Sequence, residues 1–331
     1  YTVLRNIAKL MYLDVIVRTS WYPAILGIAV AYISNIGSLT IKTWIAFIAS
    51  ILGMLAIQGL YQHSLDIVHD KGGFSAFRGE AKVSIDQAKR MSKASLIIAA
   101  ILAIIIVFTE RWWLLLLGVA AVRTAKLYVE SHNEFYAVFG FMLSYSVGYF
   151  SATNYPTLPW LIGLLLVGFV YRASLAMYRL DDYLDGEIPS TYAIIQYYRN
   201  IMRYTLHMIP LLTVILLASI TNIKYYVHAL PTYIPILAWG LGFGYMGFNM
   251  LRYKAKAVLQ EAPVWAVALA VMVTDIYSSY IVGDMLNIVK TAFTYSVWWL
   301  IFYQFWISRH AMCNYVKCPV NPFTLMKEKP K

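Results

Sequence analysis

The sequence predicts an all-α, polytopic bundle of membrane-spanning helices, and its composition and apolar patterning both indicate this fold class. Of the 331 residues, 60% are hydrophobic and only 13% are charged, whereas a soluble domain carries about 25% charged residues. Mean hydropathy is +0.62, and uncharged runs long enough to cross a bilayer recur along the chain. Water-soluble and disordered proteins are thereby excluded, and we expect a multi-pass protein of the cell membrane.

The apolar runs predict about ten spans within a single transmembrane domain of residues 1–331. Uncharged stretches cover residues 19–41, 43–65, 94–109, 135–171, 204–223, 225–251 and 291–308. The stretch 135–171 is too long for one helix and divides at the turn signal of residues 151–156. Residues 112–128 and 262–282 complete the set, with Asp275 expected to be a structural partner. Ser84 and Gln87 have the spacing of a capping box, so Asp86 between them is expected to be structural.

The 27 Lys and Arg residues, and a net charge of +11, could indicate nucleic-acid binding, but their distribution indicates membrane orientation. With ten spans and a cytoplasmic N-terminus, 23 of them fall in cytoplasmic segments. The other four fall outside; they are Lys42, Arg111, Lys224 and Lys290. Cytoplasmic loops are enriched in Lys and Arg, so this division favours both the helix count and the orientation, and no nucleic-acid partner is expected.

Two acidic clusters occur at the cytoplasmic ends of even-numbered predicted spans. Gln62, Asp66 and Asp70 are each four residues apart, so they lie along one face of a helix. Asp181 and Asp185 repeat this spacing 115 residues later (181 − 66 = 115), and Asp182 points about 100° away. Carboxylates at this spacing repel one another, and near a bilayer a cation must offset their charge. Mg²⁺ commonly bridges carboxylates to substrate phosphates, so both pairs are expected to hold Mg²⁺ on a diphosphate; solvated helix ends are the simpler alternative.

At these aspartates the chain resembles the UbiA superfamily of intramembrane prenyltransferases. That family carries an N-D-x-x-D-x-x-x-D-like motif after its second helix and a D-x-x-x-D motif after its sixth. Asp66 and Asp70 match the first motif, and Asp181 and Asp185 match the second. Chain length and helix order agree over most of residues 10–250. Gly72-Gly73 with Arg78-Gly79, and the segment 133–135, look like the dihydroxynaphthoate polyprenyltransferase branch.

The resemblance implies a nine-helix core, here extended by a tenth helix, and Mg²⁺ as the cofactor. It implies transfer of a polyprenyl group from an allylic diphosphate to an aromatic quinone precursor or another lipophilic acceptor, with the prenyl tail among membrane lipids. Asp66, Asp70, Asp181 and Asp185 would be the catalytic metal ligands. The expected substrate-binding residues are Gln62, Arg78, Lys82 and Lys126, although each cation is equally explained by membrane orientation. His69 is a secondary metal candidate.

Two departures from the family pattern favour an alternative function. Gln62 stands where the family usually has Asn, and the span 291–308 exceeds the usual nine helices. A non-catalytic lipid- or quinone-binding subunit of a membrane protein complex would have these features. The four retained aspartates favour the enzyme, because a scaffold has no need of mutually repelling carboxylates.

Overall fold

The computed structural model describes residues 22–34, 37–69, 83–184 and 191–220, with a few residues between 280 and 289. Throughout this part of the chain the regular structure is helical, as the sequence predicts. Four of its helices are long and apolar enough to cross a membrane; they are Ile41–His69, Ile85–Val107, Trp112–Ser131 and Glu134–Ala152. The predicted spans after residue 224 and Asp275 lie outside the described residues, so the ten-helix count stays a prediction.

The chain divides into two compact units, Tyr1–Leu164 and Leu165–Lys331. The first contains α3 (Tyr22–Ile33), α4 (Ile41–Met54), the π-helix η2 (Leu55–Tyr61), α5 (Gln62–His69), α6 (Ile85–Val107), α7 (Trp112–Ser131) and α8 (Glu134–Ala152). Beyond these, α9 (Leu158–Leu184) begins in the first unit and ends in the second, which also contains α10 (Tyr192–Ile220). That residues 1–331 form one domain stays a prediction.

Helix boundaries follow local sequence signals. Thr40 caps α4 through a reciprocal pair of hydrogen bonds with Thr43, each of 3.3 Å. Ser84 caps α6 in the same way, since it accepts a bond from the Gln87 backbone and donates one to the Gln87 side chain. The predicted capping box is therefore confirmed. The predicted division of 135–171 is also confirmed, because α8 ends at Ala152 and α9 begins at Leu158.

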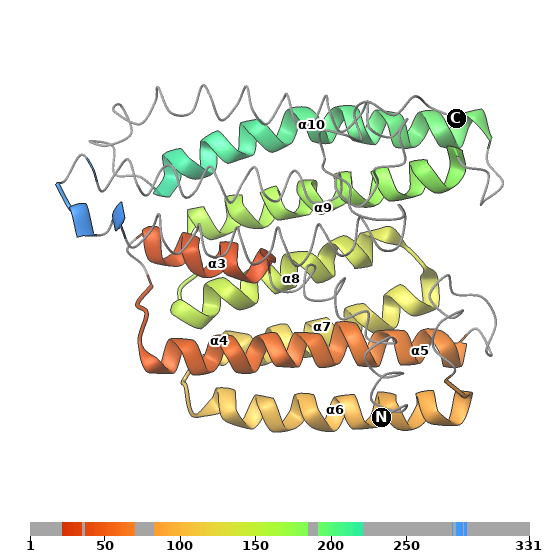
Figure 1. Cartoon of the computed structure of the whole chain (residues 1–331), viewed down its shortest axis with the longest axis horizontal. Helices are drawn as coiled ribbons and strands as arrows, with labels where there is room; N and C mark the ends of the chain where they lie inside the picture. The colour runs from red at the N-terminus through yellow and green to blue at the C-terminus, as the bar shows by residue number, and fades with distance from the viewer. Residues whose placement is uncertain are drawn as a thin grey trace. The chain divides into compact units, whose positions relative to one another are not determined.

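Within the first unit, α4, η2 and α5 form one continuous helix that contacts both α6 and α7, and α8 contacts α3, α4 and α7 (Figure 1). Helix α8 provides much of the core: Tyr145, Tyr149 and Phe150 are among the largest fully buried side chains. The predicted span 19–41 is represented by the shorter α3, and α9 continues beyond the uncharged stretch that ends at residue 171 as far as Leu184.

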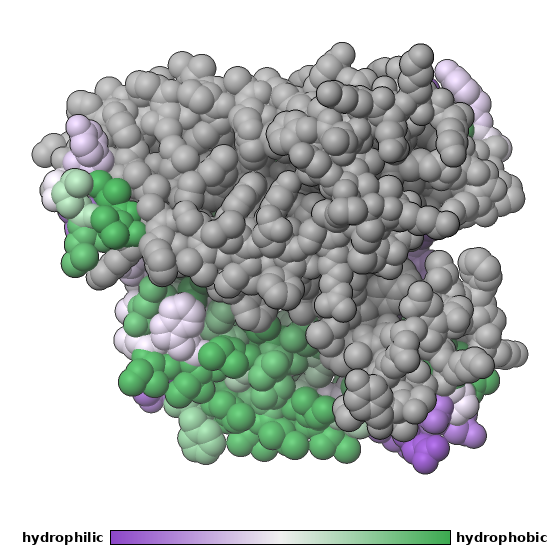
Figure 2. Space-filling view, in the orientation of Figure 1, coloured by the Kyte–Doolittle hydropathy of each residue, from purple (hydrophilic) through white to green (hydrophobic). Residues whose placement is uncertain are grey.

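A broad apolar surface covers the outer sides of α4 and α6 (Figure 2). Large aliphatic side chains are exposed along α4, including Ile45, Ile48 and Leu52, and along α6, including Ile97, Ile101 and Ile104. Soluble proteins rarely expose a patch of this extent, whereas helices that face hydrocarbon tails are apolar on their outer sides. These two faces therefore have the apolar character of a surface that contacts lipid.

Candidate metal and diphosphate site

Asp66 lies near the end of a 29-residue helix, Ile41–His69, that is long enough to cross a bilayer. Its side chain is partly buried, and its Oδ1 atom is shielded from solvent. Two neighbouring side chains on α5, Ser64 and Ile67, are buried, and Ile67 packs against Ala88 of α6. Asp66 lies about 100° around the helix from Ile67 and on nearly the opposite side from Ser64, so it lies outside the face that packs against α6.

Gln62 is the first residue of α5, one turn before Asp66, and is partly buried. The helical spacing predicted for these two residues is therefore present. The other predicted residues of this cluster, Asp70, Arg78 and Lys82, lie outside the described residues. Their roles as a metal ligand and as diphosphate-binding cations stay predictions.

Asp181 belongs to the last turn of α9, as the sequence predicts for a helix end. Its backbone is described but its side chain is not, and Asp185 lies outside the described residues. Asp66 belongs to the first unit and Asp181 to the second. The meeting of the two aspartate pairs in one cavity accordingly stays a prediction.

Lys126 is exposed near the end of α7 and forms an ion pair with Glu130, at 3.7 Å between Nζ and Oε1. Both side chains are about half exposed, at 50% and 48%. Such pairs contribute little to stability and exchange readily with solvent, so Lys126 can still reach an anionic ligand. The predicted contact with a diphosphate stays a prediction.

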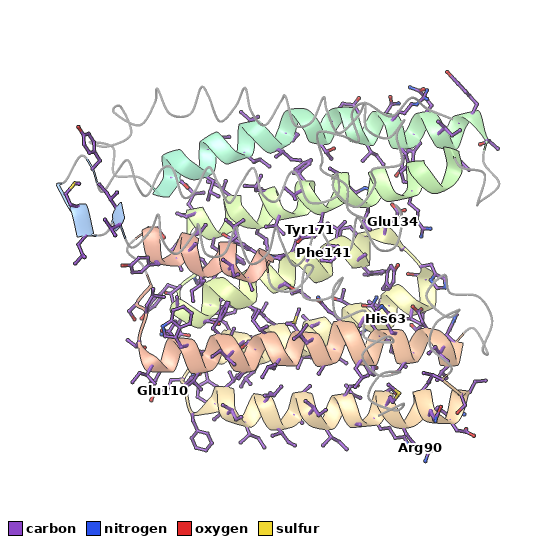
Figure 3. The ribbon with its side chains drawn as sticks, viewed as in Figure 1. His63, Arg90, Glu110, Glu134, Phe141 and Tyr171 are labelled. Atoms are coloured by element: carbon purple, nitrogen blue, oxygen red, sulfur yellow. The ribbon has the colours of Figure 1, made fainter. Side chains whose placement is uncertain are left out.

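Polar side chains lie at both ends of the first unit (Figure 3). His63, Arg90 and Glu134 lie at the end that also carries α5, and Glu110 lies at the opposite end. At the α5 end, the ring of His69 meets the ring of His132 at a centroid distance of 6.1 Å, and His132 ends α7 in a left-handed conformation with φ of 50°. This contact brings a residue of α7 beside the predicted metal cluster, and nothing in the spacing of His132 along the chain could indicate it.

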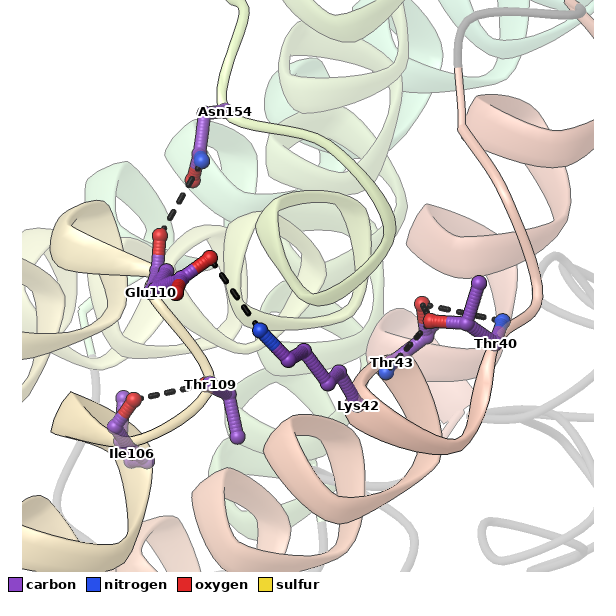
Figure 4. A network of polar contacts seen from close by, with 7 residues as sticks. All are labelled: Thr40, Lys42, Thr43, Ile106, Thr109, Glu110 and Asn154. Carbon is purple, nitrogen blue, oxygen red and sulfur yellow. Dashed lines mark hydrogen bonds and ion pairs between the residues drawn. The ribbon is translucent and has the colours of Figure 1, made fainter.

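The opposite end of the unit holds a polar network that joins three segments (Figure 4). Lys42 at the start of α4 forms an ion pair of 3.2 Å with Glu110 in the turn between α6 and α7. Asn154, between α8 and α9, donates a bond of 3.1 Å to the Glu110 carbonyl. Burial lowers the pKa of the neighbouring Arg111 from its ordinary value, and the charge of Glu110 opposes this effect. The network pairs one cation, Lys42, with one carboxylate, Glu110, so it joins helix ends and does not resemble a metal site.

Gln58 is a polar residue in the middle of a membrane-length helix that sequence analysis missed. Its Nε2 atom donates to the carbonyl oxygen of Gly140 on α8 at 2.9 Å, and lies 3.4 Å from Oγ of Ser144. A signal was present, because Gln58 precedes Gln62 by the same four residues that separate Gln62 from Asp66. Polar side chains at membrane depth are costly and commonly functional.

The chemistry of the donor set suits Mg²⁺, which prefers oxygen ligands from carboxylates and amides. Asp66 offers a carboxylate of which one oxygen is shielded from water, and Gln62 offers an amide one turn away. Within the described residues, no group of three or more His, Cys, Asp or Glu side chains could hold a metal ion. Asp70 and Asp185 lie outside the described residues, so the described part of the chain does not include all four aspartates.

Comparisons with known proteins leave the family open: no family model, no curated protein and no solved structure matches the chain.

Proposed function

We propose that the chain is a Mg²⁺-dependent intramembrane prenyltransferase of the UbiA type. It moves a polyprenyl group from an allylic diphosphate to an aromatic quinone precursor or another lipophilic acceptor. One observation carries the proposal: the Asp-x-x-x-Asp pattern occurs at residues 66–70 and again at 181–185, in a chain whose first copy begins near the end of a membrane-length helix.

The aspartates provide hard, negatively charged oxygen atoms at the boundary between lipid and water. Bound Mg²⁺ would neutralise the charge that develops on diphosphate as the bond between the allylic carbon and oxygen breaks. Asp66, Asp70, Asp181 and Asp185 hold the metal, and Gln62 contacts the metal-bound diphosphate or water through its amide. Arg78, Lys82 and Lys126 bind the remaining diphosphate oxygens by charge-assisted hydrogen bonds. The acceptor then forms the new bond to the allylic carbon, and diphosphate leaves toward water.

The proposed topology places this chemistry on the cytoplasmic side of the cell membrane. Ten spans and a cytoplasmic N-terminus put both aspartate pairs on the same side, with nine helices forming the core and residues 291–308 adding a tenth. The separation of Lys and Arg into 23 cytoplasmic and four outer residues supports this arrangement. The prenyl tail extends between helices toward lipid, because burying a polyisoprene chain in water-filled space is unfavourable.

The second candidate is a non-catalytic subunit that binds a lipid or quinone within a membrane complex. The observation that favours it is Gln62, which has one methylene more than the Asn of the family motif and displaces the amide outward. In that function the aspartates have no metal to bind, so the protein would show no Mg²⁺-dependent activity. One purified sample can therefore distinguish the two functions by its Mg²⁺-dependent prenyl transfer.

The test is an assay of the purified full chain in lipid nanodiscs with radiolabelled farnesyl or geranylgeranyl diphosphate and a panel of hydroxylated aromatic and glycerol-phosphate acceptors. The expected result is a prenylated product and equimolar pyrophosphate, both dependent on Mg²⁺ and both abolished by a chelator. The proposal is overturned if the protein neither binds the diphosphate nor releases pyrophosphate with any acceptor. Co-purification of other membrane subunits in that case would support the second candidate.

A further inference from the structure

A π-helical turn interrupts the helix that carries Asp66. Residues Leu55–Tyr61 form η2 between α4 and α5, and the backbone N–H of Gln62 donates to the carbonyl of Ile57, five residues earlier. A turn closed over five residues takes up about one residue more than an α-helical turn. Because each residue of an α-helix advances by about 100°, η2 rotates α5 by about that angle relative to an unbroken continuation of α4.

Helical periodicity shows that, without this rotation, Asp66 would lie on the exposed side of the helix. Ile48 on the lipid-facing side of α4 is 55% exposed, and Asp66 follows it by 18 residues (66 − 48 = 18). Eighteen residues make about five complete turns of α-helix, so in an unbroken helix Asp66 would lie directly in line with Ile48. The same spacing relates exposed Trp44 to Gln62 (62 − 44 = 18). Without the π-turn, the polar face of α5 would be directed at lipid, where a carboxylate is strongly unfavourable.

Asp66 is partly buried and its Oδ1 is shielded from solvent, whereas Ile48 on the same continuous helix is 55% exposed. In the rotated arrangement Ile67 is the residue in line with Ile48, and it is covered by its contact with Ala88 of α6. In an α-helix, a residue lies about 40° further around the axis than the residue four positions before it. In a π-turn it lies slightly less than a full turn beyond that residue. The step from Gln58 to Gln62 is of the second kind and the step from Gln62 to Asp66 is of the first kind, so the two angles nearly cancel and the three side chains lie close to one line along the helix.

Gln58 fastens this turn to a neighbouring helix. Its Nε2 atom donates to the Gly140 carbonyl at 2.9 Å and lies 3.4 Å from Oγ of Ser144, which itself donates to the same carbonyl at 3.2 Å. Gly140 leaves space for the amide, because a Cβ there would lie 3.3 Å from Nε2 of Gln58. Hydrogen bonds of this kind between membrane helices compete with no water, and they hold the two helices in one arrangement.

We propose that Gln58 is a positioning residue that holds the π-turn and thereby directs Asp66 away from lipid and into the bundle. Its consequence for catalysis rests on the proposed function, because Asp66 is there a ligand of Mg²⁺. The rotation itself is a property of the fold, and it can be measured without any assay of prenyl transfer.

The first experiment measures the affinity for Mg²⁺ in the transfer assay. Gln58→Leu keeps the size of the side chain but removes the donor, so the half-saturating Mg²⁺ concentration should rise about tenfold, as when a supporting hydrogen bond of a metal ligand is lost. The KM for the acceptor should stay unchanged. A loss of folded protein would instead lower the maximal rate and leave the half-saturating Mg²⁺ concentration as it is in the parent. Ser144→Ala, which keeps the shorter bond of Gln58, is the matched control and should behave as the parent.

A rescue variant distinguishes positioning from packing. Deleting Ala56, inside η2, removes the extra residue of the π-turn, so a plain α-helix can join α4 and α5 in their present orientations. The deletion should therefore restore the Mg²⁺ affinity of Gln58→Leu. If Gln58 merely packs, the deletion will damage the variant further, and that result overturns the proposal.

The second experiment reads the rotation directly in the full chain, with Cys313 and Cys318 replaced by Ser. Nitroxide labels on single cysteines introduced along α4 and along residues 62–69 report which side of each helix meets oxygen dissolved in lipid. We expect labels at positions 62 and 66, which follow exposed Trp44 and Ile48 by 18 residues, to be shielded from this oxygen in both the parent and the Ala56 deletion. In Gln58→Leu both labels should become as accessible to oxygen as labels on the exposed side of α4. Full oxygen access at 62 and 66 in the parent overturns the proposal.

The two experiments fail in different ways. Absence of prenyl transfer in the parent removes the proposed function but leaves the label measurement to decide the role of Gln58. If Gln58→Leu does not fold, its combination with the Ala56 deletion decides: a double variant that folds with the labelling pattern of the parent supports the proposal, and one that still does not fold overturns it.

Discussion

Gly148 on α8 lies directly against the backbone of Ala24 on α3, so closely that a Cβ at position 148 would overlap the carbonyl group of Ala24. A second close contact runs in the other direction: a Cβ at Gly27 of α3 would collide with the backbone of Tyr145 on α8. Small residues let membrane helices approach to backbone contact, and the close approach is the main source of attraction between them. The α3–α8 pair is therefore held by glycines far apart in the sequence.

Gly148→Ala should destabilise the protein strongly, because the new methyl group can be accommodated only by moving one helix. We expect a loss of at least about 2 kcal/mol in the free energy of unfolding, within the range of overpacked cores. Gly118→Ala on α7 is the matched control: a Cβ at that position meets no atom within 4 Å, and Ala favours a helix by up to about 1 kcal/mol over Gly. Thermal unfolding in detergent micelles compares the two variants; equal stability would contradict the α3–α8 contact.

Glu110 should tolerate glycine better than alanine. It lies in the turn between α6 and α7 with φ of 61°, a left-handed conformation that costs a residue with a Cβ about 1 kcal/mol. Both substitutions remove the exposed ion pair with Lys42, so the difference between them isolates the backbone effect. In the same unfolding measurement we expect Glu110→Gly to be more stable than Glu110→Ala. The expected difference is about 1 kcal/mol once the greater entropy that Gly gives to the unfolded chain has been subtracted. The opposite order would contradict the left-handed turn.

Local signals in the sequence predicted much of the fold. Long apolar runs indicated α4 to α8, Ser84 and Gln87 indicated the start of α6, and the turn signal at 151–156 indicated the end of α8. Contacts between distant residues were not predictable, because no local pattern marks Gly27 and Gly148 as partners. The π-turn was missed for a similar reason: residues 55–61 have the composition of any membrane helix. It becomes evident only when the exposed side of Ile48 is compared with the position of Asp66.

The candidate site was predicted in part. The aspartate spacing was read from the sequence, and Asp66 and Asp181 do lie near the ends of long helices. The role of Gln58 depends on its bond to α8, and the meeting of His69 with His132 depends on how α5 and α7 pack. Neither relationship has a sequence pattern of its own.

The C-terminal segment should lie in the cytoplasm. The 23-to-4 division of Lys and Arg requires residues 291–308 to cross the membrane, because Arg309 and the lysines after it would otherwise be outside. In intact cells an impermeant thiol reagent should therefore leave Cys313 and Cys318 unlabelled, and labelling should appear once the cells are permeabilised. A cysteine introduced at Lys42, in a predicted outer segment, is the positive control. Labelling of the native cysteines in intact cells would remove the tenth span.

Loss of one aspartate should affect prenyl transfer far more than a change in Gln62. Asp66→Asn and Asp181→Asn each delete a charged metal ligand, and we expect transfer to fall by at least about 100-fold, the scale of losing one electrostatic stabiliser. Gln62→Asn keeps the amide donor and acceptor and shortens the side chain by one methylene, so activity should survive. Asp86→Asn is the matched control, because Asp86 is an exposed residue in the first turn of α6, between the two residues of its capping box; it should transfer at the parental rate. The measurement is the initial rate of Mg²⁺-dependent product formation at saturating diphosphate, with folding checked by thermal unfolding. Asp66→Asn at the parental rate would mean that this carboxylate binds no catalytic metal, and the helix end would then be an ordinary solvated one.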